Sequence, residues 1–292
     1  MSNFTVISGK GSQELGKKIA AKLKAKYVKS DLLVFPDGES KITLISKPKK
    51  GTIIVVQSTY PPVDSNLIQA LSLVSKARQF SSQVYAVIPY IGYTRQDREF
   101  LPGEIVTMSV VAALFKAAGA TRIIVVDIHS KIALKHFRIA VKNVTAVPEL
   151  AQYFKKLKLR KPLVVSPDLG GKSRAKQFAK LLNTKFIALQ KLRDRKTGKI
   201  KIKSPNLKKV KGRDLILIDD MISTGKSIVK ATEFLKKQNC RRVYVACTHA
   251  LLVGDAEKKI RKAGVSKLVS TNTIPGKTSL VDVSAAIAKA IV

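Results

Sequence analysis

The sequence contains little cysteine, little acid and no tryptophan. It has two cysteines in 292 residues, and neither Cys240 nor Cys247 stands in a C-x-x-C or histidine-rich setting, which argues against a zinc or dithiol motif. The chain has 19 acidic and 55 basic residues, so its formal net charge is +36. A charge of this size favours polyanionic partners, but it does not distinguish nucleic acid from small phosphate compounds.

Long hydrophobic runs are also missing. No apolar block approaches the roughly 18 to 20 residues that span a membrane, and residues 1–18 lack the basic start and apolar stretch of a signal peptide. There is no RGG tract, basic tail or RNP-type aromatic pattern. We therefore expect a cytoplasmic protein with no membrane partner, whose lysines mostly lie on solvated helix faces.

Short apolar blocks carry the fold prediction. Each block is followed by a polar turn and then a helical pattern, which is typical of buried parallel strands. The blocks are residues 52–56, 84–88, 122–126, 163–165, 215–218 and 243–247. Apolar residues between them recur at spacings of three and four, as in Leu67, Leu71 and Val74. This alternation of strands and helices predicts an α/β fold.

The order of these features repeats along the chain. Gly51 and Gly212, which are 161 residues apart, each open a strand that leads into a helix and then into a second strand. Duplication of one doubly wound unit is the simplest explanation. We predict two similar doubly wound parallel-sheet domains, residues 1–145 and 146–292, of which the second would carry a mobile basic loop.

Two polar stretches are expected to form two-stranded flaps. Residues 35–41 contain a Pro-Asp-Gly turn between apolar flanks, and residues 191–201 form a basic stretch with a Thr-Gly turn. Taken alone, the basic stretch is typical of a solvated surface loop.

The strongest candidate site lies in residues 215–231. An apolar strand leads to Asp219 and Asp220, and a loop of small hydroxyl and glycine residues then opens directly into a helix. Loop amides and the positive end of the helix form an anion site, to which Thr224 and Ser227 add hydroxyl donors. The two carboxylates can accept hydrogen bonds from ribose hydroxyls or hold magnesium, although a polar strand end that caps the helix is the structural alternative.

Two Gly-Lys-Ser sequences match only the end of a Walker A loop. The one at residues 225–227 would need a glycine at position 220, which is aspartate, and the one at 171–173 would need a glycine at position 166, which is serine. A nucleoside triphosphate must therefore be held in another way.

The Asp-Asp and Ser-Thr-Gly-Lys-Ser sequence resembles the ribose-phosphate loop of type I phosphoribosyltransferases and ribose-phosphate pyrophosphokinases. Four further motifs resemble the pyrophosphokinases in particular. They are the adenine-side flag 35–40, the ATP segment 89–99, the Asp-x-His metal motif within 125–130 and the diphosphate-side loop 166–175. The chain also resembles the shorter, archaeal-type members of that family.

This resemblance implies roles for particular residues. ATP would be bound by Phe35, which stacks on the base, and by Asp37, Gly38, Glu39, Arg95 and Gln96. Ribose 5-phosphate would be bound by Arg193, Asp219, Asp220, Ser223, Thr224, Gly225, Lys226 and Ser227. Lys191 and Arg193 would be catalytic, and His129 and Asp168 would lie on the magnesium side. Ser223 stands where the family usually has aspartate, and Lys226 where a small residue is common.

The implied activity is that of a ribose-phosphate diphosphokinase. It would transfer the β,γ-diphosphoryl group of Mg²⁺-bound ATP to the 1-hydroxyl of ribose 5-phosphate, giving phosphoribosyl diphosphate and AMP. The resemblance further implies a homo-oligomer with ATP sites between subunits and no requirement for nucleic acid. Two alternatives stay open: a type I phosphoribosyltransferase, and a non-catalytic relative that binds nucleic acid through its positive charge.

Overall fold

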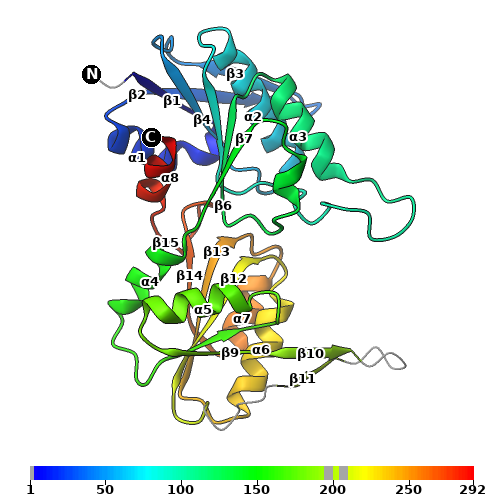
Figure 1. Cartoon of the computed structure of the whole chain (residues 1–292), viewed down its shortest axis with the longest axis vertical. Coiled ribbons are helices and arrows are strands. Elements are labelled where there is room, and N and C mark those ends of the chain that lie inside the picture. The colour runs from blue at the N-terminus through cyan, green and yellow to red at the C-terminus, as the bar shows by residue number, and fades with distance from the viewer. Residues whose placement is uncertain (1–2, 194–199, 204–209) are drawn as a thin grey trace. The chain divides into compact units, whose positions relative to one another are not determined.

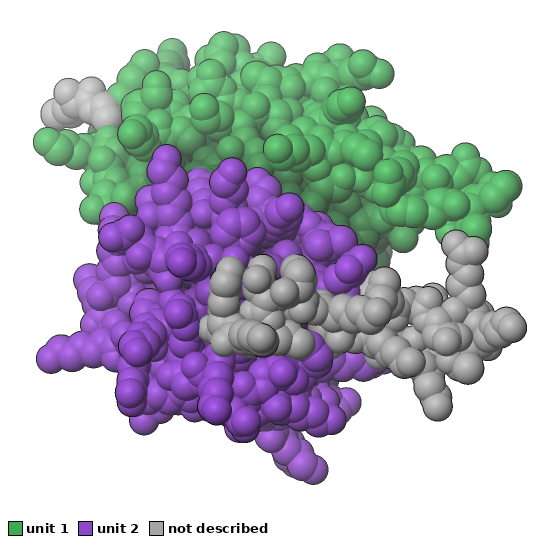
Figure 2. Space-filling model, turned by 60° about the horizontal axis from the view of Figure 1, so that its bottom comes forward, with its two compact units in different colours: residues 1–145, 272–275, 282–292 green, residues 146–271, 276–281 purple. Residues whose placement is uncertain are grey.

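The computed structural model describes residues 3–193, 200–203 and 210–292. The chain divides into two compact units (Figure 2). Unit 1 comprises residues 1–145, 272–275 and 282–292, and unit 2 comprises residues 146–271 and 276–281. None of the helices in the described ranges is long and apolar enough to cross a membrane.

Unit 1 is built on a seven-stranded sheet with the order β3-β2-β1-β4-β5-β6-β7 (Figure 1). All neighbouring strands pair in parallel except the antiparallel β2 and β3. The strands are β1 Phe4–Ser8, β2 Lys26–Val34, β3 Ser40–Leu44, β4 Thr52–Val56, β5 Val84–Ile88, β6 Arg122–Val126 and β7 Ala140–Val144. The central strands are apolar on both faces because helices cover both faces of the sheet.

The helices of unit 1 include the last element of the chain. They are η1 Lys10–Ser12, α1 Gln13–Leu23, α2 Val63–Arg78, α3 Thr107–Ala117, η2 Ala133–His136 and α8 Ser284–Ile291. Helix α8 buries Ile287 and Ile291 and packs against α1, while Asp282 forms an ion pair with Lys18 at 3.2 Å. The structure therefore differs from the expected second domain of 146–292, because this apolar face is buried in unit 1.

Unit 2 is built on a six-stranded parallel sheet with the order β15-β14-β13-β12-β8-β9. Its strands are β8 Leu163–Ser166, β9 Lys185–Ala188, β12 Asp214–Ile222, β13 Arg242–Ala250, β14 Val265–Thr271 and β15 Ser279–Val281. Its helices are α4 Val147–Lys155, α5 Lys172–Leu181, α6 Lys226–Lys236 and α7 Ala256–Lys262. The predicted pair of doubly wound parallel sheets is confirmed, and all six predicted strands are present.

Both predicted flaps are antiparallel hairpins. In unit 1, β2 and β3 pair on either side of residues 35–39. In unit 2, β10 Gln190–Arg193 pairs with β11 Ile200–Lys203, while the connecting residues 194–199 lie outside the described part of the chain. The β2–β3 hairpin belongs to the sheet of unit 1, whereas β10 and β11 form a two-stranded sheet of their own.

Candidate active site

Strand β12 places Asp219 and Asp220 within its last four residues. It pairs with β8 only as far as Leu217, but with β13 as far as Ile222. The strand therefore extends beyond residue 218, where the apolar run predicted that it would end. The reason is that Met221 and Ile222 are buried and continue the strand after the two carboxylates.

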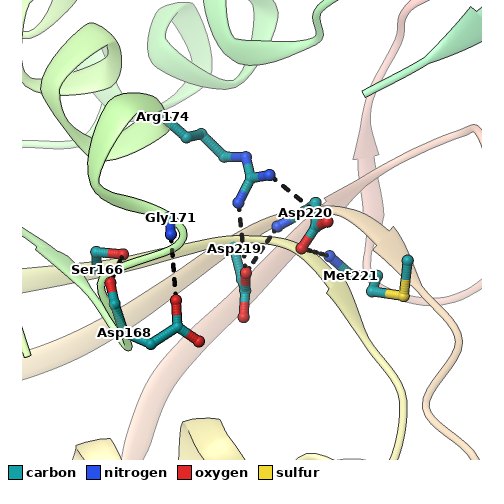
Figure 3. A network of polar contacts seen from close by, with 7 residues as sticks. All are labelled: Ser166, Asp168, Gly171, Arg174, Asp219, Asp220 and Met221. Carbon is teal, nitrogen blue, oxygen red and sulfur yellow. Dashed lines mark hydrogen bonds and ion pairs between the residues drawn. The ribbon is translucent and has the colours of Figure 1, made fainter. Parts of the chain in front are cut away.

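Arg174 on α5 joins the two carboxylates (Figure 3). Its Nη1 lies 3.4 Å from Asp219 Oδ1 and its Nη2 lies 3.5 Å from Asp220 Oδ2. The three side chains are largely buried, so this contact is poorly screened by solvent. Arg174 was missing from the predicted site, although it stands within the diphosphate-side motif at residues 166–175. The one available signal was a basic residue two positions into the helix after that loop.

The carboxylate pair has an unusual protonation equilibrium. Burial raises the pKa of Asp219 to about 8, and the neighbouring charge of Asp220 adds to this rise, while Arg174 opposes it. Backbone amides hold both groups, since Asp220 N donates to Asp219 Oδ1 at 3.0 Å and Met221 N donates to Asp220 Oδ1 at 2.9 Å. Burial and the charge of Asp220 therefore favour a proton on Asp219, and a pair that shares a proton can both donate and accept hydrogen bonds.

Asp168 shapes the loop between β8 and α5. Its Oδ1 accepts a hydrogen bond from Gly171 N at 3.1 Å, and Ser166 Oγ donates to the backbone oxygen of Asp168 at 2.7 Å. A Cβ on Gly171 would lie 2.5 Å from Ser166 Oγ, so the tight turn requires glycine. The charge of Asp168 also contributes to the raised pKa of Asp219, as expected for carboxylates on neighbouring strands of one sheet edge.

Gly225 turns the chain from β12 into α6. It has a left-handed backbone with φ of 72° and is the N-cap residue of the 11-residue helix. Thr224 and Lys226 are exposed, Ser223 and Ser227 are half-buried, and the first turn of α6 contains no acidic residue. Helix N-termini of this kind bind anions through backbone amides. An anion site at residues 223–227 therefore stays a prediction.

The flag is the turn that connects β2 and β3. Phe35 is 41% exposed, and Asp37, Gly38 and Glu39 are exposed as well. Phe35 N donates to Glu39 O at 2.8 Å, and Glu39 N donates to Asp37 Oδ1 at 3.0 Å. One Asp37 oxygen is therefore used by the turn itself, and the positive φ of Gly38 closes the turn. The turn presents an accessible aromatic ring beside two acidic residues.

The ATP segment and the metal motif of unit 1 are joined by Asp97. Its buried carboxylate forms a short hydrogen bond with the Ser130 hydroxyl, and its backbone oxygen lies 2.7 Å from His136 Nε2. Arg95 and Gln96, which precede it, are exposed. Sequence reasoning selected these two exposed residues and missed the buried residue that anchors them, although Asp97 follows them directly.

His129 is presented by a sharp turn at the end of β6. Asp127 adopts a left-handed backbone with φ of 39°, and its amide donates to Val144 O at 2.8 Å. Ile128 N donates to Asn143 Oδ1 at 3.1 Å, and Ile128 is buried while His129 is exposed. Aspartate tolerates this backbone better than most residues, which gives Asp127 a structural role in the Asp-x-His motif.

The remaining predicted residues are located by backbone alone. Lys191 and Arg193 lie on β10, opposite Ile202 and Ile200 of β11, and their side chains lie outside what the structure describes. Phe35, Asp37, Gly38, Glu39, Arg95, Gln96 and His129 belong to unit 1, and Asp168, Lys191, Arg193, Asp219, Asp220, Ser223, Thr224, Gly225, Lys226 and Ser227 belong to unit 2. The predicted site residues are thus divided between the two units.

The carboxylates of unit 2 are ligands of the type that magnesium prefers, but in the described part of the chain too few such side chains lie together to hold the ion by themselves. Asp168, Asp219 and Asp220 offer carboxylate oxygens, which Mg²⁺ prefers. Within residues 3–193, 200–203 and 210–292, no group of three or more His, Cys, Asp or Glu residues could hold a metal ion by itself.

Two doubly wound units, one of which carries an acidic strand end and a glycine-opened helix, define a protein with the type I phosphoribosyltransferase fold. Residues 4–119 match the family model described as the N-terminal domain of ribose phosphate pyrophosphokinase, and residues 189–292 match the phosphoribosyl synthetase-associated domain. The matched ranges cover most of the chain.

Individual proteins agree with these models. The chain is 36% identical over 290 residues to the ribose-phosphate pyrophosphokinase of Sulfurisphaera tokodaii, covering 98% of this chain and 99% of the relative. It is 35% identical to that of Methanopyrus kandleri, covering 95% of each. The crystal structure of phosphoribosylpyrophosphate synthetase from Mycobacterium smegmatis superposes with a TM-score of 0.86 at 26% identity, covering 99% of this chain and 97% of the other.

The chain therefore belongs to the ribose-phosphate pyrophosphokinase family. The family, the fold and the enzymatic activity predicted from the motifs are confirmed, and the alternative of a type I phosphoribosyltransferase is not favoured.

Proposed function

We propose that the chain carries out the reaction of its family with sugar-phosphate binding in unit 2 and nucleotide recognition in unit 1. The reaction transfers the β,γ-diphosphoryl group of ATP to the 1-hydroxyl of ribose 5-phosphate and releases AMP. The observation that carries the proposal is the turn from β12 to α6, where Asp219 and Asp220 precede a helix that Gly225 opens.

Ribose 5-phosphate binds at this turn through its two polar ends. The 5-phosphate lies at the N-terminus of α6, where backbone amides, the hydroxyls of Thr224 and Ser227, and the charge of Lys226 neutralise it. Ser223 adds a hydroxyl at the entrance of the loop. The ribose hydroxyls bind Asp219 and Asp220, and a pair that holds one proton can accept from one hydroxyl and donate to another.

ATP binds through the exposed loops of unit 1. The ring of Phe35 stacks on adenine, and Asp37, Gly38 and Glu39 contact the polar edge of the base. Arg95 and Gln96 bind the nucleotide from the segment that Asp97 anchors. The exposure of Phe35, Asp37, Glu39, Arg95 and Gln96 supports this role, because a nucleotide can reach them from solvent.

Magnesium is the cofactor that the donor set fits. We assign His129 of unit 1 and Asp168 of unit 2 to the magnesium side, with His129 acting through water because Mg²⁺ prefers oxygen ligands. When bound, the ion neutralises charge on the phosphates. Asp168 is kept in position for this by the Gly171 amide.

Lys191 and Arg193 supply the catalytic charges. Both residues lie on β10, two positions apart along the strand. They stabilise the charge that spreads over the transferring group while the ribose 1-hydroxyl attacks the β-phosphorus and AMP leaves. Arg193 also contacts ribose 5-phosphate.

The active form is a homo-oligomer with ATP sites between subunits. The flag hairpin leaves Leu33, Val34 and Phe35 between 41% and 56% exposed, and apolar clusters of this kind are typical of protein interfaces. Nucleic acid is not required for the reaction.

The test is AMP release from ATP and Mg²⁺, measured with and without ribose 5-phosphate. AMP that appears only with the sugar phosphate supports the proposal, whereas ADP would indicate an ordinary kinase. Release of diphosphate in the presence of a nitrogenous base and phosphoribosyl diphosphate would indicate a phosphoribosyltransferase. Salt-dependent RNA binding without any AMP production would favour the non-catalytic alternative.

A further inference from the structure

The positive charge of the chain is concentrated in unit 2. This unit has 33 basic and 9 acidic residues, a net charge of +24, whereas unit 1 has 22 and 10, a net charge of +12. The substrates of the reaction require cations in both units. The reaction therefore does not explain why unit 2 carries twice the excess.

Residues 155–185 contain much of this excess. Ten of these 31 positions are Lys or Arg, and Asp168 is the sole acidic residue among them. Asp168 and Arg174 belong to the active site, which leaves nine cations with no acidic residue among them. These nine are Lys155, Lys156, Lys158, Arg160, Lys161, Lys172, Lys176, Lys180 and Lys185, and all of them are exposed.

Helix α5 arranges three of these lysines in a row. Lys172, Lys176 and Lys180 recur every four residues, so they follow one face of the helix at a rise of roughly 6 Å per step. Lys185 lies on β9, which pairs with β8 beside the helix (Figure 1). In the part of the chain that the structure describes, none of these four lysines forms an ion pair with a carboxylate.

A hollow of about 490 Å³ lies between this helix face and β9. Lys176 and Lys180 line it together with the hydrogen-bonding side chains Ser173, Gln177 and Thr184. Half-buried Phe186 contributes an aromatic surface to the lining. Cations for phosphates, polar groups for sugar and base edges, and an aromatic ring for stacking are the features with which proteins bind single-stranded nucleic acid.

We propose that this cationic groove, formed by Lys176, Gln177, Lys180, Thr184, Lys185 and Phe186, binds single-stranded RNA. Lys176, Lys180 and Lys185 contact successive phosphates of the backbone, and a base stacks on Phe186. The lysines of residues 155–161, which precede β8, extend the same positive field and raise the rate of encounter with a polyanion. The groove uses none of the residues placed in the catalytic reaction.

The apolar surface of unit 2 argues against an anionic membrane as the partner. Helices that lie on membranes combine a basic face with large exposed apolar side chains. In the described part of unit 2 the large apolar residues that are exposed are Leu169, Val253 and Leu280. None of them belongs to the groove or to residues 155–161, so the surface offers phosphate contacts without a hydrophobic anchor.

The test compares two charge-reversed variants of the full chain that have the same net charge. The groove variant is K176E/K180E/K185E, and the control variant K47E/K50E/K116E reverses three exposed lysines of unit 1. Binding of a fluorescently labelled 20-nucleotide single-stranded RNA is measured by anisotropy at several salt concentrations. AMP release with ribose 5-phosphate is measured on the same preparations, and circular dichroism checks that both variants are folded.

We expect the groove variant to bind RNA at least about 10-fold more weakly than the unchanged chain, and the control less than about 3-fold. The slope of log affinity against log salt should fall by roughly 2 in the groove variant, because about 0.7 is lost for each of three phosphate contacts to a single strand. Both variants should keep normal AMP release.

Four results would overturn the proposal. The first is equal loss in the groove and control variants, which would mean that net charge alone binds RNA. The second is binding of inorganic polyphosphate at the groove without binding of RNA. The third is binding of the chain to vesicles that contain phosphatidylserine, under conditions in which it does not bind RNA. The fourth concerns a variant that combines Phe186→Leu with the three groove substitutions. An RNA affinity of this variant equal to that of the unchanged chain would overturn the proposal.

Discussion

The two units use the same strand-to-helix turn in different ways. In unit 1, β4 leads into α2 through buried polar residues. Gln57 Nε2 donates to Asn66 Oδ1 at 2.9 Å, and Asn66 Nδ2 donates to Tyr60 O at 2.8 Å. Ser58 N donates to Ser12 Oγ at 2.9 Å. Side chains of unit 1 itself therefore fill this turn, although the buried Gln57 Oε1 has no hydrogen-bond partner among the described residues.

In unit 2, β12 leads into α6 through charged residues and a glycine. Asp219 and Asp220 precede the turn, Gly225 opens the helix, and Thr224 and Lys226 are exposed beside its N-terminus. One fold element thus packs against its own unit in unit 1, whereas in unit 2 we propose that it binds an anion. The comparison shows that the duplicated scaffold does not by itself determine a binding site, since buried Gln57, Ser58 and Asn66 line one turn and Asp219, Asp220 and Gly225 form the other.

We expect the largest loss of activity when a positive charge of unit 2 that acts only during diphosphoryl transfer is removed. We expect Lys191→Ala to lower kcat by roughly 10² to 10³ with a smaller change in KM, because a donor to the transition state is lost. Steady-state AMP release at saturating substrates measures this. The matched control is Lys201→Ala on the paired strand β11, which should stay within about 3-fold of the unchanged chain. Near-normal turnover of Lys191→Ala would remove this lysine from the mechanism.

The next prediction concerns a side chain added to the turn between β12 and α6 of unit 2. A Cβ on Gly225 would lie 3.0 Å from Ile260 Cδ1 on a backbone with φ of 72°, so Gly225→Ala should displace the loop. We expect KM for ribose 5-phosphate to rise roughly 10- to 100-fold, since small displacements of a binding group are costly. KM for ATP should change little.

Gly212→Ala is the control for this change. Gly212 has a similar φ of 70°, but nothing lies within 4 Å of its Cβ position, so the substitution imposes the same backbone strain away from the site. If both variants raise KM for ribose 5-phosphate equally, the effect is one of stability and the loop is not the phosphate site.

We expect a smaller loss of activity when the contact between Asp97 and Ser130 in unit 1 is weakened. Asp97→Asn weakens the hydrogen bond to Ser130 that ties the ATP segment to the metal motif. We expect kcat/KM for ATP to fall roughly 10-fold, while KM for ribose 5-phosphate stays unchanged. Ser130→Ala should have a similar effect, and the double variant should lose no more than either single variant, because both changes remove one contact. Additive losses would show that the two residues act separately.

The covered turn of unit 1 should affect stability rather than binding. Gln57→Ala removes the hydrogen bonds to Ser58 and Asn66 and leaves buried polar groups without partners. We expect the free energy of unfolding to fall by about 1–3 kcal/mol, as measured by denaturant unfolding. KM for both substrates should stay within about 2-fold. A rise in KM for ribose 5-phosphate alone would contradict the view that the turn of unit 1 serves stability and the turn of unit 2 serves binding.

The subtlest effect concerns the pH dependence of stability. The folded chain holds a proton on Asp219 up to a pKa of about 8, whereas the unfolded chain releases it near 3.8. The folded state therefore binds more protons between these values, and this residue makes stability fall as pH rises from about 4 to about 8. In Asp219→Asn that contribution should disappear. Thermal unfolding at several pH values in this range compares the slopes, and parallel curves would contradict the raised pKa.

The six predicted strands could be identified from the sequence because they are continuous apolar runs. The edge strands β7 and β9 could not, since they carry lysine or asparagine among their apolar residues, and neither could the inner strands β1 and β14, of which β14 begins with Val-Ser-Lys. The return of α8 to unit 1 was also hidden. Its amphipathic pattern predicts a buried face, but it does not state which unit provides the partner surface.

The candidate site was predictable where a local motif carries it. The turn at residues 223–227 and the hairpin turn at 35–39 are contained in short segments, so spacing alone indicates them. Arg174 and Asp97 were missed because their roles depend on partners far along the chain, Asp219 in one case and Ser130 in the other. The extra length of β12 was missed because two aspartates interrupt its apolar pattern.

The central claim is that the helix N-terminus opened by Gly225 holds the 5-phosphate of the sugar. A crystal structure of the full chain with ribose 5-phosphate, Mg²⁺ and a non-hydrolysable ATP analogue tests it most directly. We predict that the phosphate accepts hydrogen bonds from the backbone amides of residues 224–227, with the ribose hydroxyls at Asp219 and Asp220. A sugar phosphate bound elsewhere, with this turn blocked by the chain's own side chains, would contradict the account.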